Sequence, residues 1–413
     1  MTTTVTVLQG GNVLDLDRGV LLKNHQVVIE GERIIEVSAH PVARPGARVL
    51  DVTGKTVMPG LIDCHVHVLA SSANLGANAG QPSVLATIRA LPILKAMLAR
   101  GFTSVRDAGG ADWGLMQAVD SGLIPGPRIF PSGKALSQTG GHGDFRARGD
   151  VLEPCSCCFR TGAIARVADG VEAVRMAVRE ELQMGATQIK IMASGGVASP
   201  TDPIANTQYS REEICAIVDE AEAANTYVMA HAYTPRAIKR AVGCGVRCIE
   251  HGNLVDVDTA DFMRVQGAYV VPTLVTYDAL ATHGPQFGLP PESVAKVAAV
   301  REAGRRSLGI YAQAGVSMGF GSDLLGDMHR FQCDEFRIRA EVLGNLEALR
   351  SATSVAADIL QQRGELGVIT PGALADVLIV EGNPLDDIGV LSGEGEQVTY
   401  VFQRGRLVKD SAS

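Results

Sequence analysis

The sequence predicts an α/β protein, a (β/α)8 TIM barrel accompanied by a small β-sandwich domain formed from both chain ends. Three observations support this prediction. The 413 residues exceed the roughly 250 of one ordinary barrel. Short β-branched segments gather near both ends of the chain, and between them apolar runs alternate with longer stretches of helical period.

The β-branched segments at the two ends are separated by Gly, Asn and Pro. They comprise 5–8, 26–30, 33–37 and 48–52 near the start, and 372–381, 398–403 and 406–408 near the end. Because a short isolated sheet is only marginally stable, we expect the two ends to pair into one sandwich. The predicted domains are therefore residues 1–58 with 364–413, and a barrel from 59 to 363.

The middle of the chain contains eight candidate strands. They are 61–66, 103–106, 128–131, 188–192, 227–230, 246–250, 269–272 and 316–319. Amphipathic helices are predicted between them, at 84–99, 171–184, 210–224 and 293–314. Strands that alternate with helices require a parallel sheet, and eight of them can close a barrel. The segment 134–169, rich in Gly and polar residues, is predicted to be a functional loop or an insertion.

Composition and charge restrict the class of protein. Hydrophobic residues make up 46% and charged residues 20%, which is typical of a soluble globular protein. The net charge of −8 and the absence of a Lys/Arg run exclude nucleic acid as an expected partner. No apolar run approaches about 18 residues, so we expect no membrane contact. The first residues lack an export signal, which predicts a cytoplasmic protein.

The eight cysteines are scattered through a large chain without an export signal, so reduced thiols are expected. Cys155, Cys157 and Cys158 form the one cluster. It lacks a second pair of ligands, which disfavours a structural zinc site there.

The clearest chemical signal is the segment 59–67, PGLIDCHVH. Side chains two apart on a strand share a face, so Asp63, His65 and His67 are predicted to turn inward, with the histidine Cα atoms about 6.6 Å apart. Two imidazoles at that spacing can reach one metal ion. Taken alone, the pair could equally be two polar residues at a strand end, but its position after a barrel strand favours a metal site.

Lys190 lies inside the apolar segment 188–192, where an unpaired ammonium would cost several kcal/mol. An exposed edge position or an unseen carboxylate partner would remove that cost. Reaction with carbon dioxide would remove it differently, because a carbamate is an anion whose two oxygens can bridge two cations.

His231, His251 and Asp323 also follow predicted strands. Each alone is typical of a strand end or a helix cap. Together with the histidine pair and Lys190 they come after strands one, four, five, six and eight, on the face where barrel enzymes hold their active sites.

These residues, with the phrases PGLID at 59–63 and ITPGALADV at 369–377, resemble the amidohydrolase superfamily in its binuclear, carboxylated-lysine form. The resemblance implies a site for two divalent ions, with Zn²⁺ the expected metal, in which His65, His67 and Asp323 bind the more buried ion. It implies that His231 and His251 bind the more exposed ion. It further implies that Lys190, as N6-carboxylysine, bridges both.

The phrases SQTGGHG at 137–143, IKIMASGG at 189–196 and MAHAY at 229–233 resemble the imidazolonepropionase-like branch, with its Xaa-Pro dipeptidases and relatives that hydrolyse ochratoxin A. This resemblance implies that His142 polarises the scissile carbonyl and that Tyr233 holds the substrate carboxylate. A loop histidine and a rim aromatic are the alternatives. The family often forms homo-oligomers, so we expect one, with an octamer as a candidate.

The expected activity is hydrolysis of an amide bond in a small substrate with a free carboxylate, such as an Xaa-Pro dipeptide or an N-acyl amino acid. Two bound cations would lower the pKa of a shared water toward neutrality. Asp323 is the expected acceptor of the proton from that water and its donor to the departing amine. His283, His329 and Asp107 are further candidates for the pocket, although solvated loop positions and a turn cap explain them as well.

Three alternatives stay open at this point. A mononuclear ring deaminase on the same fold would need no bridging residue, so Lys190 argues against it. A lactonase or phosphotriesterase would retain both metals, and His142 with Tyr233 favours a carboxylate-bearing amide instead. A non-catalytic scaffold would have no use for six inward polar residues.

Overall fold

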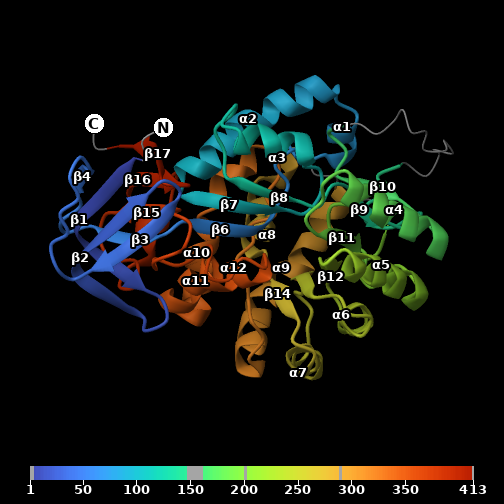
Figure 1. Ribbon diagram of the computed structural model, residues 1–413. Coiled ribbons are helices and arrows are strands. Elements are labelled where there is room, and N and C mark those ends of the chain that lie inside the picture. Colours follow the sequence, from blue (N-terminus) through green and yellow to red (C-terminus); the bar gives the residue numbers. More distant parts are fainter. Residues whose placement is uncertain (1–3, 147–160, 200–201, 288–290, 412–413) are drawn as a thin grey trace.

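The computed structural model describes residues 4–146, 161–199, 202–287 and 291–411. A β-rich body that contains both chain ends lies beside a larger body of mixed strands and helices (Figure 1). Cys155, Cys157 and Cys158, the cluster noted above, lie outside the described residues. No helix in the described ranges is long and apolar enough to cross a membrane.

The two chain ends form one hydrogen-bonded sheet of eight strands, in the order β17-β16-β15-β5-β1-β2-β3 with β4 paired to β1. Its strands are β1 (Val5–Asp15), β2 (Val20–Glu30), β3 (Arg33–Ser38), β4 (Arg48–Asp51), β5 (Thr56–Pro59), β15 (Val377–Val380), β16 (Val398–Gln403) and β17 (Arg406–Asp410). The antiparallel pairing of β15 with β5 joins the two ends, with Ile379 opposite Val57. The prediction that both ends build one β unit is therefore confirmed.

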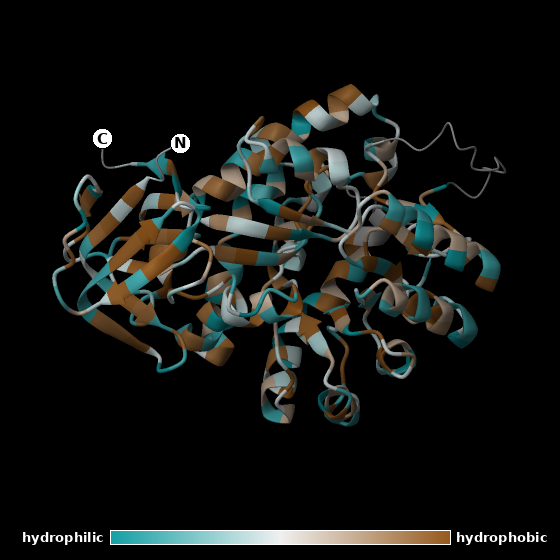
Figure 2. Cartoon of the chain, viewed as in Figure 1, coloured by the Kyte–Doolittle hydropathy of each residue, from teal (hydrophilic) through white to brown (hydrophobic). Residues whose placement is uncertain are grey.

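The buried face of this sheet explains why the ends pair. Leu8, Val27, Val57, Ile379 and Phe402 belong to one apolar cluster to which both ends of the chain contribute. Figure 2 shows apolar residues along these strands. The other face of the central strands is buried as well, because Leu378 and Val401 pack with Leu61 and Phe102 of the larger body. The division at residues 58 and 364 stays a prediction.

The larger body has the TIM-barrel type of architecture. Its parallel strands are β6 (Leu61–Val66), β7 (Phe102–Asp107), β8 (Arg128–Pro131), β9 (Ala135–Ser137), β10 (Ala165–Val167), β11 (Ile189–Met192), β12 (Val228–Ala232), β13 (Cys248–His251) and β14 (Tyr269–Val271). They form two ladders, β6-β7-β8 and β10-β9-β11-β12-β13-β14. Seven of the eight predicted barrel strands are thus present as strands.

The eighth predicted strand, 316–319, differs from the expectation. It makes one parallel bridge, between Met318 and Val270, rather than a ladder. A few backbone hydrogen bonds nevertheless connect this part of the chain to both neighbours. Gly319 N donates to Val270 O at 2.8 Å and Val270 N to Ser317 O at 3.1 Å, while Cys64 N donates to Phe320 O at 2.8 Å. Glycine at 315, 319 and 321 weakens strand propensity, which accounts for the short pairing.

The segment 134–169 is not all loop, because β9 and β10 lie within it and pair in parallel. Each of these two strands has only three residues, and the Gly-rich sequence around them did not predict a strand. The four predicted helices are present as α2 (Ser83–Ala99), α4 (Val171–Gln183), α5 (Arg211–Ala223) and α9 (Pro291–Ala314). The other helices are α1 (Leu75–Ala79), α3 (Trp113–Asp120), α6 (Pro235–Val242), α7 (Val257–Val265), α8 (Leu274–His283), α10 (Asp334–Leu343), α11 (Asn345–Ser351) and α12 (Ser354–Ile359).

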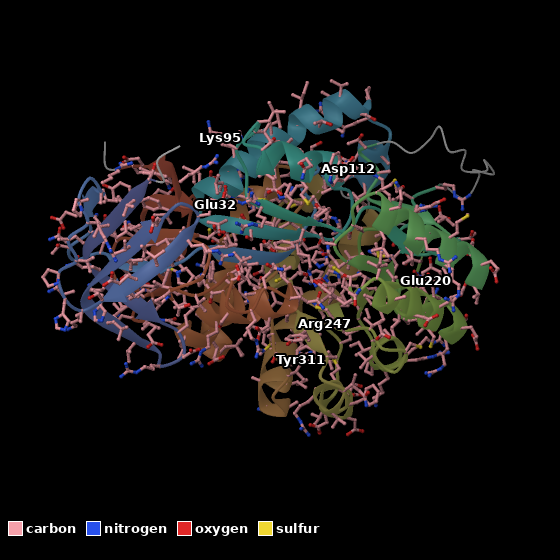
Figure 3. All side chains as sticks on the ribbon, in the orientation of Figure 1. Glu32, Lys95, Asp112, Glu220, Arg247 and Tyr311 are labelled. Carbon is pink, nitrogen blue, oxygen red and sulfur yellow. The ribbon has the colours of Figure 1, made fainter. Side chains whose placement is uncertain are left out.

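Local sequence explains where several helices begin. Ser210 and Glu213 form a capping box at the start of α5, and the Thr234 side chain caps α6, which has Pro235 in its first turn. Both devices satisfy amide groups that the first helical turn leaves unpaired. Charged pairs join neighbouring helices: Glu220 on α5, labelled in Figure 3, binds Arg175 and Arg179 of α4.

Candidate metal centre and substrate pocket

Six side chains converge at the carboxyl ends of the barrel strands. His65 and His67 come from β6, Lys190 from β11, His231 from β12, His251 from the last position of β13, and Asp323 from the stretch after the Met318 bridge. All six line one pocket. The structure therefore brings together every residue that the sequence predicted as a metal ligand.

Three of these residues form a compact donor group. The Nε2 atoms of His65 and His67 lie 3.5 and 3.4 Å from Oδ1 of Asp323. One ligand atom from each lies within 4.8 Å of the others. The Asp323 amide donates to the carbonyl of His65 at 2.8 Å, which holds the carboxylate against β6. This group could bind a metal ion.

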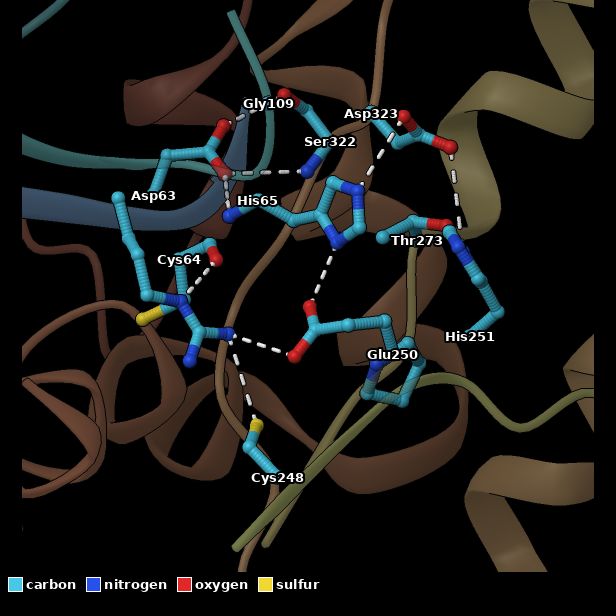
Figure 4. Close-up of polar contacts among 12 residues, drawn as sticks. Asp63, Cys64, His65, Gly109, Cys248, Glu250, His251, Thr273, Ser322 and Asp323 are labelled. Carbon is cyan, nitrogen blue, oxygen red and sulfur yellow. Dashed lines mark hydrogen bonds and ion pairs between the residues drawn. The ribbon is translucent and has the colours of Figure 1, made fainter. Parts of the chain in front are cut away.

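Hydrogen bonds on the far nitrogens orient the rings of this group. Nδ1 of His65 lies 2.6 Å from Oε2 of Glu250, and Nδ1 of His67 lies 2.9 Å from the carbonyl of Gly109. Figure 4 shows the His65 ring between the carboxylates of Glu250 and Asp323. With Nδ1 engaged, each ring presents Nε2 to Asp323, the arrangement found in metal-binding histidines.

The other two histidines are held similarly. Nδ1 of His251 lies 2.8 Å from Oγ1 of Thr273, and Nε2 of His231 lies 3.1 Å from the carbonyl of Gly195. The nitrogens that remain for a metal are therefore Nε2 of His251 and Nδ1 of His231. The two rings are close neighbours, with centroids 4.6 Å apart.

Two of the pocket residues have left-handed backbone conformations. φ is +71° at His251 and +51° at Asp323, a region that residues other than glycine rarely adopt. Such conformations persist only where the surrounding structure enforces them. Both residues line the pocket, so the two strained backbone positions coincide with the candidate site.

Burial sets the protonation of the donor group. It lowers the pKa of His65, His231 and His251 well below the usual range, so these three imidazoles are neutral. Burial also acts to lower the pKa of His67, but the hydrogen bond to Asp323 raises that pKa overall. Burial alone would raise the pKa of Asp323, but His65 and His67 lower it overall, which keeps the carboxylate ionised. Neutral imidazoles and an ionised carboxylate are the forms that bind a cation.

Lys190 is 1% exposed and faces the same pocket. Burial lowers its pKa to about 8, although the carboxylates of Glu250 and Asp323 act to raise it. No ion pair joins Lys190 to either carboxylate in the described part of the chain, so the partner considered from sequence exists only as a longer-range interaction. A neutral amine is accessible to Lys190 near physiological pH.

His142 and Tyr233 complete the polar wall of the pocket. The His142 ring stacks on His231 with centroids 4.3 Å apart, and its Nδ1 lies 2.7 Å from Oγ of Ser199. Burial lowers the pKa of His142 to about 4. Tyr233 is buried edge-on against His231, so it is not the exposed rim aromatic considered as the alternative.

Apart from Thr276 and Tyr277, the rest of the pocket lining is apolar and includes Leu75, Phe145, Ile164, Val197, Leu280 and Leu325. A pocket with a few converging polar groups on an apolar wall is typical of a small-molecule site.

The remaining sequence candidates lie outside the pocket lining. Asp63 is buried but accepts from Ser322, so it supports Asp323 from behind. Asp107 accepts from the amides of Val68, Gly109 and Ala111 and so shapes the turn whose carbonyl binds His67. His283 stacks on Phe331.

His329 is buried, with its Nε2 3.2 Å from the carbonyl of Ala70, and does not line the pocket.

Sequence reasoning missed Glu250, Arg106, Thr273 and Tyr277. Arg106 donates to Glu250 at 2.8 Å, and both side chains are fully buried. A signal existed for this pair, because each is a charged residue inside an apolar barrel strand, as Lys190 is. Thr273 and Tyr277 carried no comparable signal.

Comparison with known proteins agrees with this architecture. The sequence profile of the Amidohydrolase family matches residues 56–408. The chain belongs to the amidohydrolase family. It is therefore a hydrolase, and the resemblance inferred from the motifs is confirmed at the level of the family.

Three similar proteins place this amidohydrolase more closely. Ochratoxinase from Aspergillus niger is 34% identical over 98% of this chain and 87% of its own length. A crystal structure of a prolidase complexed with N-methylphosphonate-L-proline is 76% identical, covering 98% of this chain and all of that one, with a TM-score of 0.98. A Xaa-Pro dipeptidase with methionine bound in its active site is 30% identical, covering 98% and 100%, with a TM-score of 0.88.

Proposed function

We propose that this amidohydrolase is a binuclear, zinc-dependent enzyme that releases a C-terminal amino acid from Xaa-Pro dipeptides or N-acyl amino acids. Ochratoxin A is a candidate substrate, because ochratoxinase and prolidases are among its relatives. The observation that carries the proposal is the convergence of His65, His67, Lys190, His231, His251 and Asp323 on one pocket.

The donor set fits two cations. His65, His67 and Asp323 would hold one, His231 and His251 the other, and Lys190 would bridge them as N6-carboxylysine. A mixed nitrogen and oxygen set suits zinc and also accepts cobalt or manganese. When bound, the pair of ions supplies an activated water and polarises the amide carbonyl.

The side chains of the pocket have separate roles in this proposal. Asp323 takes the proton of the attacking water and delivers it to the departing amine. His142 contacts the scissile carbonyl oxygen, and Ser199 holds its ring in place. Tyr233 donates to the carboxylate of the substrate, while the apolar wall accepts the group on the acyl side.

The alternatives differ in what they require of these residues. A mononuclear deaminase gives no reason for a buried lysine among metal ligands, whereas a bridged pair does. A lactone or phosphotriester carries no carboxylate for Tyr233. A scaffold protein would bury six polar groups at a cost in free energy that no bound ion compensates.

Two measurements test the proposed function. Metal analysis of the purified enzyme should find two divalent ions per chain, and one ion would favour the deaminase. A screen of Xaa-Pro dipeptides, N-acyl amino acids and ochratoxin A, each beside its carboxamide, should show hydrolysis that depends on the carboxylate. Faster turnover of lactones or phosphotriesters would contradict the proposal.

We extend the proposal to the setting of the enzyme. Its partners in this proposal are small substrates and further copies of itself. We infer a cytoplasmic homo-oligomer, with an octamer as the candidate assembly. Nucleic acid and membranes are not expected partners at a net charge of −8. Light scattering of the purified protein measures the subunit number.

A further inference from the structure

A half-buried lysine ties the loop that follows β11 to helix α9. Lys296 lies on α9, and its Nζ donates to the backbone carbonyls of Gly196, Ser199 and Asp202 at 3.0, 2.8 and 2.7 Å. An ammonium group has three hydrogens to donate, so these carbonyls use all of them. Hydrogen bonds from a charged donor are stronger than bonds between neutral groups. One side chain of α9 therefore holds three points along a single loop.

The same loop forms part of the substrate pocket. Val197 and Ala198 line the pocket, and Ser199 Oγ lies 2.7 Å from Nδ1 of His142. The carbonyls of Gly196 and Ser199, which flank the two wall residues in sequence, are two of the three that the lysine binds. The lysine itself does not line the pocket. It therefore acts on the pocket wall from outside, through the backbone.

The base of the loop is held by bonds of its own. Ser194 and Thr207 form an antiparallel bridge, and the Asp202 carboxylate accepts from the amide of Gly196 at 3.2 Å. These bonds join parts of the same loop to one another. The bonds from Lys296 differ, because they join the loop to a separate element of the barrel.

Helix α9 provides a firm anchor for these bonds. Val297 and Val300, which follow Lys296 in the sequence, are buried in an apolar cluster that also contains Val197 and Tyr233. A closely packed cluster resists displacement of any one of its members. The loop and α9 thus meet both through the ammonium group and through the apolar side chains beside it.

We propose that Lys296 is a positioning residue that sets the pocket wall formed by Val197 and Ala198. Through Ser199 it also sets the place of the His142 ring. The inference rests on the proposed function, because that function assigns the apolar wall to the acyl group of the substrate. Without the ammonium group, the three carbonyls lose their partner and the loop loses its polar link to α9. The wall then fits the acyl group less closely.

Hydrogen exchange tests the position of the loop without any substrate. Lys296→Met removes the ammonium group and keeps an apolar stem of similar length, whereas Lys296→Arg retains a charged donor. Lys409→Met is the matched control, because Lys409 on β17 also donates to backbone carbonyls, those of Ala99 at 2.9 Å and Gly395 at 2.6 Å. Each purified protein is first compared with the unmodified enzyme by its melting temperature.

We expect the amides of Gly195, Gly196 and Asn206, which are hydrogen-bonded within the loop, to exchange about tenfold faster in Lys296→Met. This is the effect of losing about one hydrogen bond from a charged group. Lys296→Arg should restore most of the protection, and Lys409→Met should leave these amides unchanged. Unchanged protection in Lys296→Met, or equal acceleration in Lys409→Met, would overturn the proposal.

Kinetics on paired substrates provide a second readout. The pairs are N-acyl amino acids that share one C-terminal residue and differ only in the size of an apolar acyl group. Lys296→Met should lower kcat/KM about tenfold more for the large acyl group than for the small one, because the larger group makes more contact with the wall. Equal losses for both acyl groups would contradict a role in the wall. Failure of the unmodified enzyme to cleave any of these amides would instead overturn the proposed function, and hydrogen exchange would still decide whether Lys296 positions the loop.

Discussion

Oε2 of Glu250 lies 2.6 Å from Nδ1 of His65, and the other oxygen of the same carboxylate accepts from Arg106 at 2.8 Å. A buried arginine, a carboxylate and an imidazole thus form one connected group behind the candidate metal site. The carboxylate selects the tautomer of His65 that presents Nε2 to Asp323.

Replacing Glu250 with Gln should therefore weaken metal binding by about 10- to 100-fold. Competition with a chelator on the purified protein measures the change. Glu181→Gln is the matched control, because Glu181 is also a buried carboxylate, paired with Arg166 at 3.0 Å, but it lies on α4. Equal metal affinity in both variants would show that Glu250 does not orient His65.

Lys190 should form its carbamate more readily as pH rises, because only the neutral amine reacts with carbon dioxide. Burial places its pKa at about 8, so raising the pH from 7 to 8 increases the neutral fraction by about fivefold. Carbon-13 NMR of the metal-free protein, at equal dissolved labelled carbon dioxide, measures the carbamate. The signal should be absent from Lys190→Ala, and a signal that falls with rising pH would contradict the assignment.

Asp323→Asn should retain measurable metal binding but reduce kcat by about 100-fold or more, since the amide cannot accept the proton of water. Metal content and steady-state kinetics on the same preparation separate the two effects. Near-normal kcat would exclude Asp323 from proton transfer.

Gly196 lies against the ring of His142, and a methyl group there would stand 2.1 Å from Cε1 of that ring. Gly196→Ala should displace His142 and lower kcat by about 10- to 100-fold. Gly309 on α9 provides the control, because nothing lies within 4 Å of a methyl group there. Gly309→Ala should leave kcat unchanged and stabilise the protein by about 0.5 to 1 kcal/mol. Unchanged kcat in Gly196→Ala would mean that the position of His142 does not matter.

Much of the barrel could be predicted from local sequence. The period of the apolar residues placed β6 and β8 at their observed bounds, and the spacing of His65 and His67 placed both on one face of β6. These features depend only on residues a few positions apart, so the sequence of a single segment is enough to predict them. The stretch 316–319 and the short strands β9 and β10 were less predictable, because pairing with neighbours decides them.

The sequence thus predicted which residues could be ligands, which strand each follows and that they share one face. It could do so because the carboxyl ends of parallel barrel strands all lie on the same side of the barrel. Tertiary structure alone decided which nitrogen of each histidine faces the pocket. His65 meets Glu250, 185 residues later, and Tyr233 meets Tyr277, 44 residues later. Such contacts arise only when strands and helices distant in sequence pack together, because hydrogen-bond direction is set by partners and not by local period.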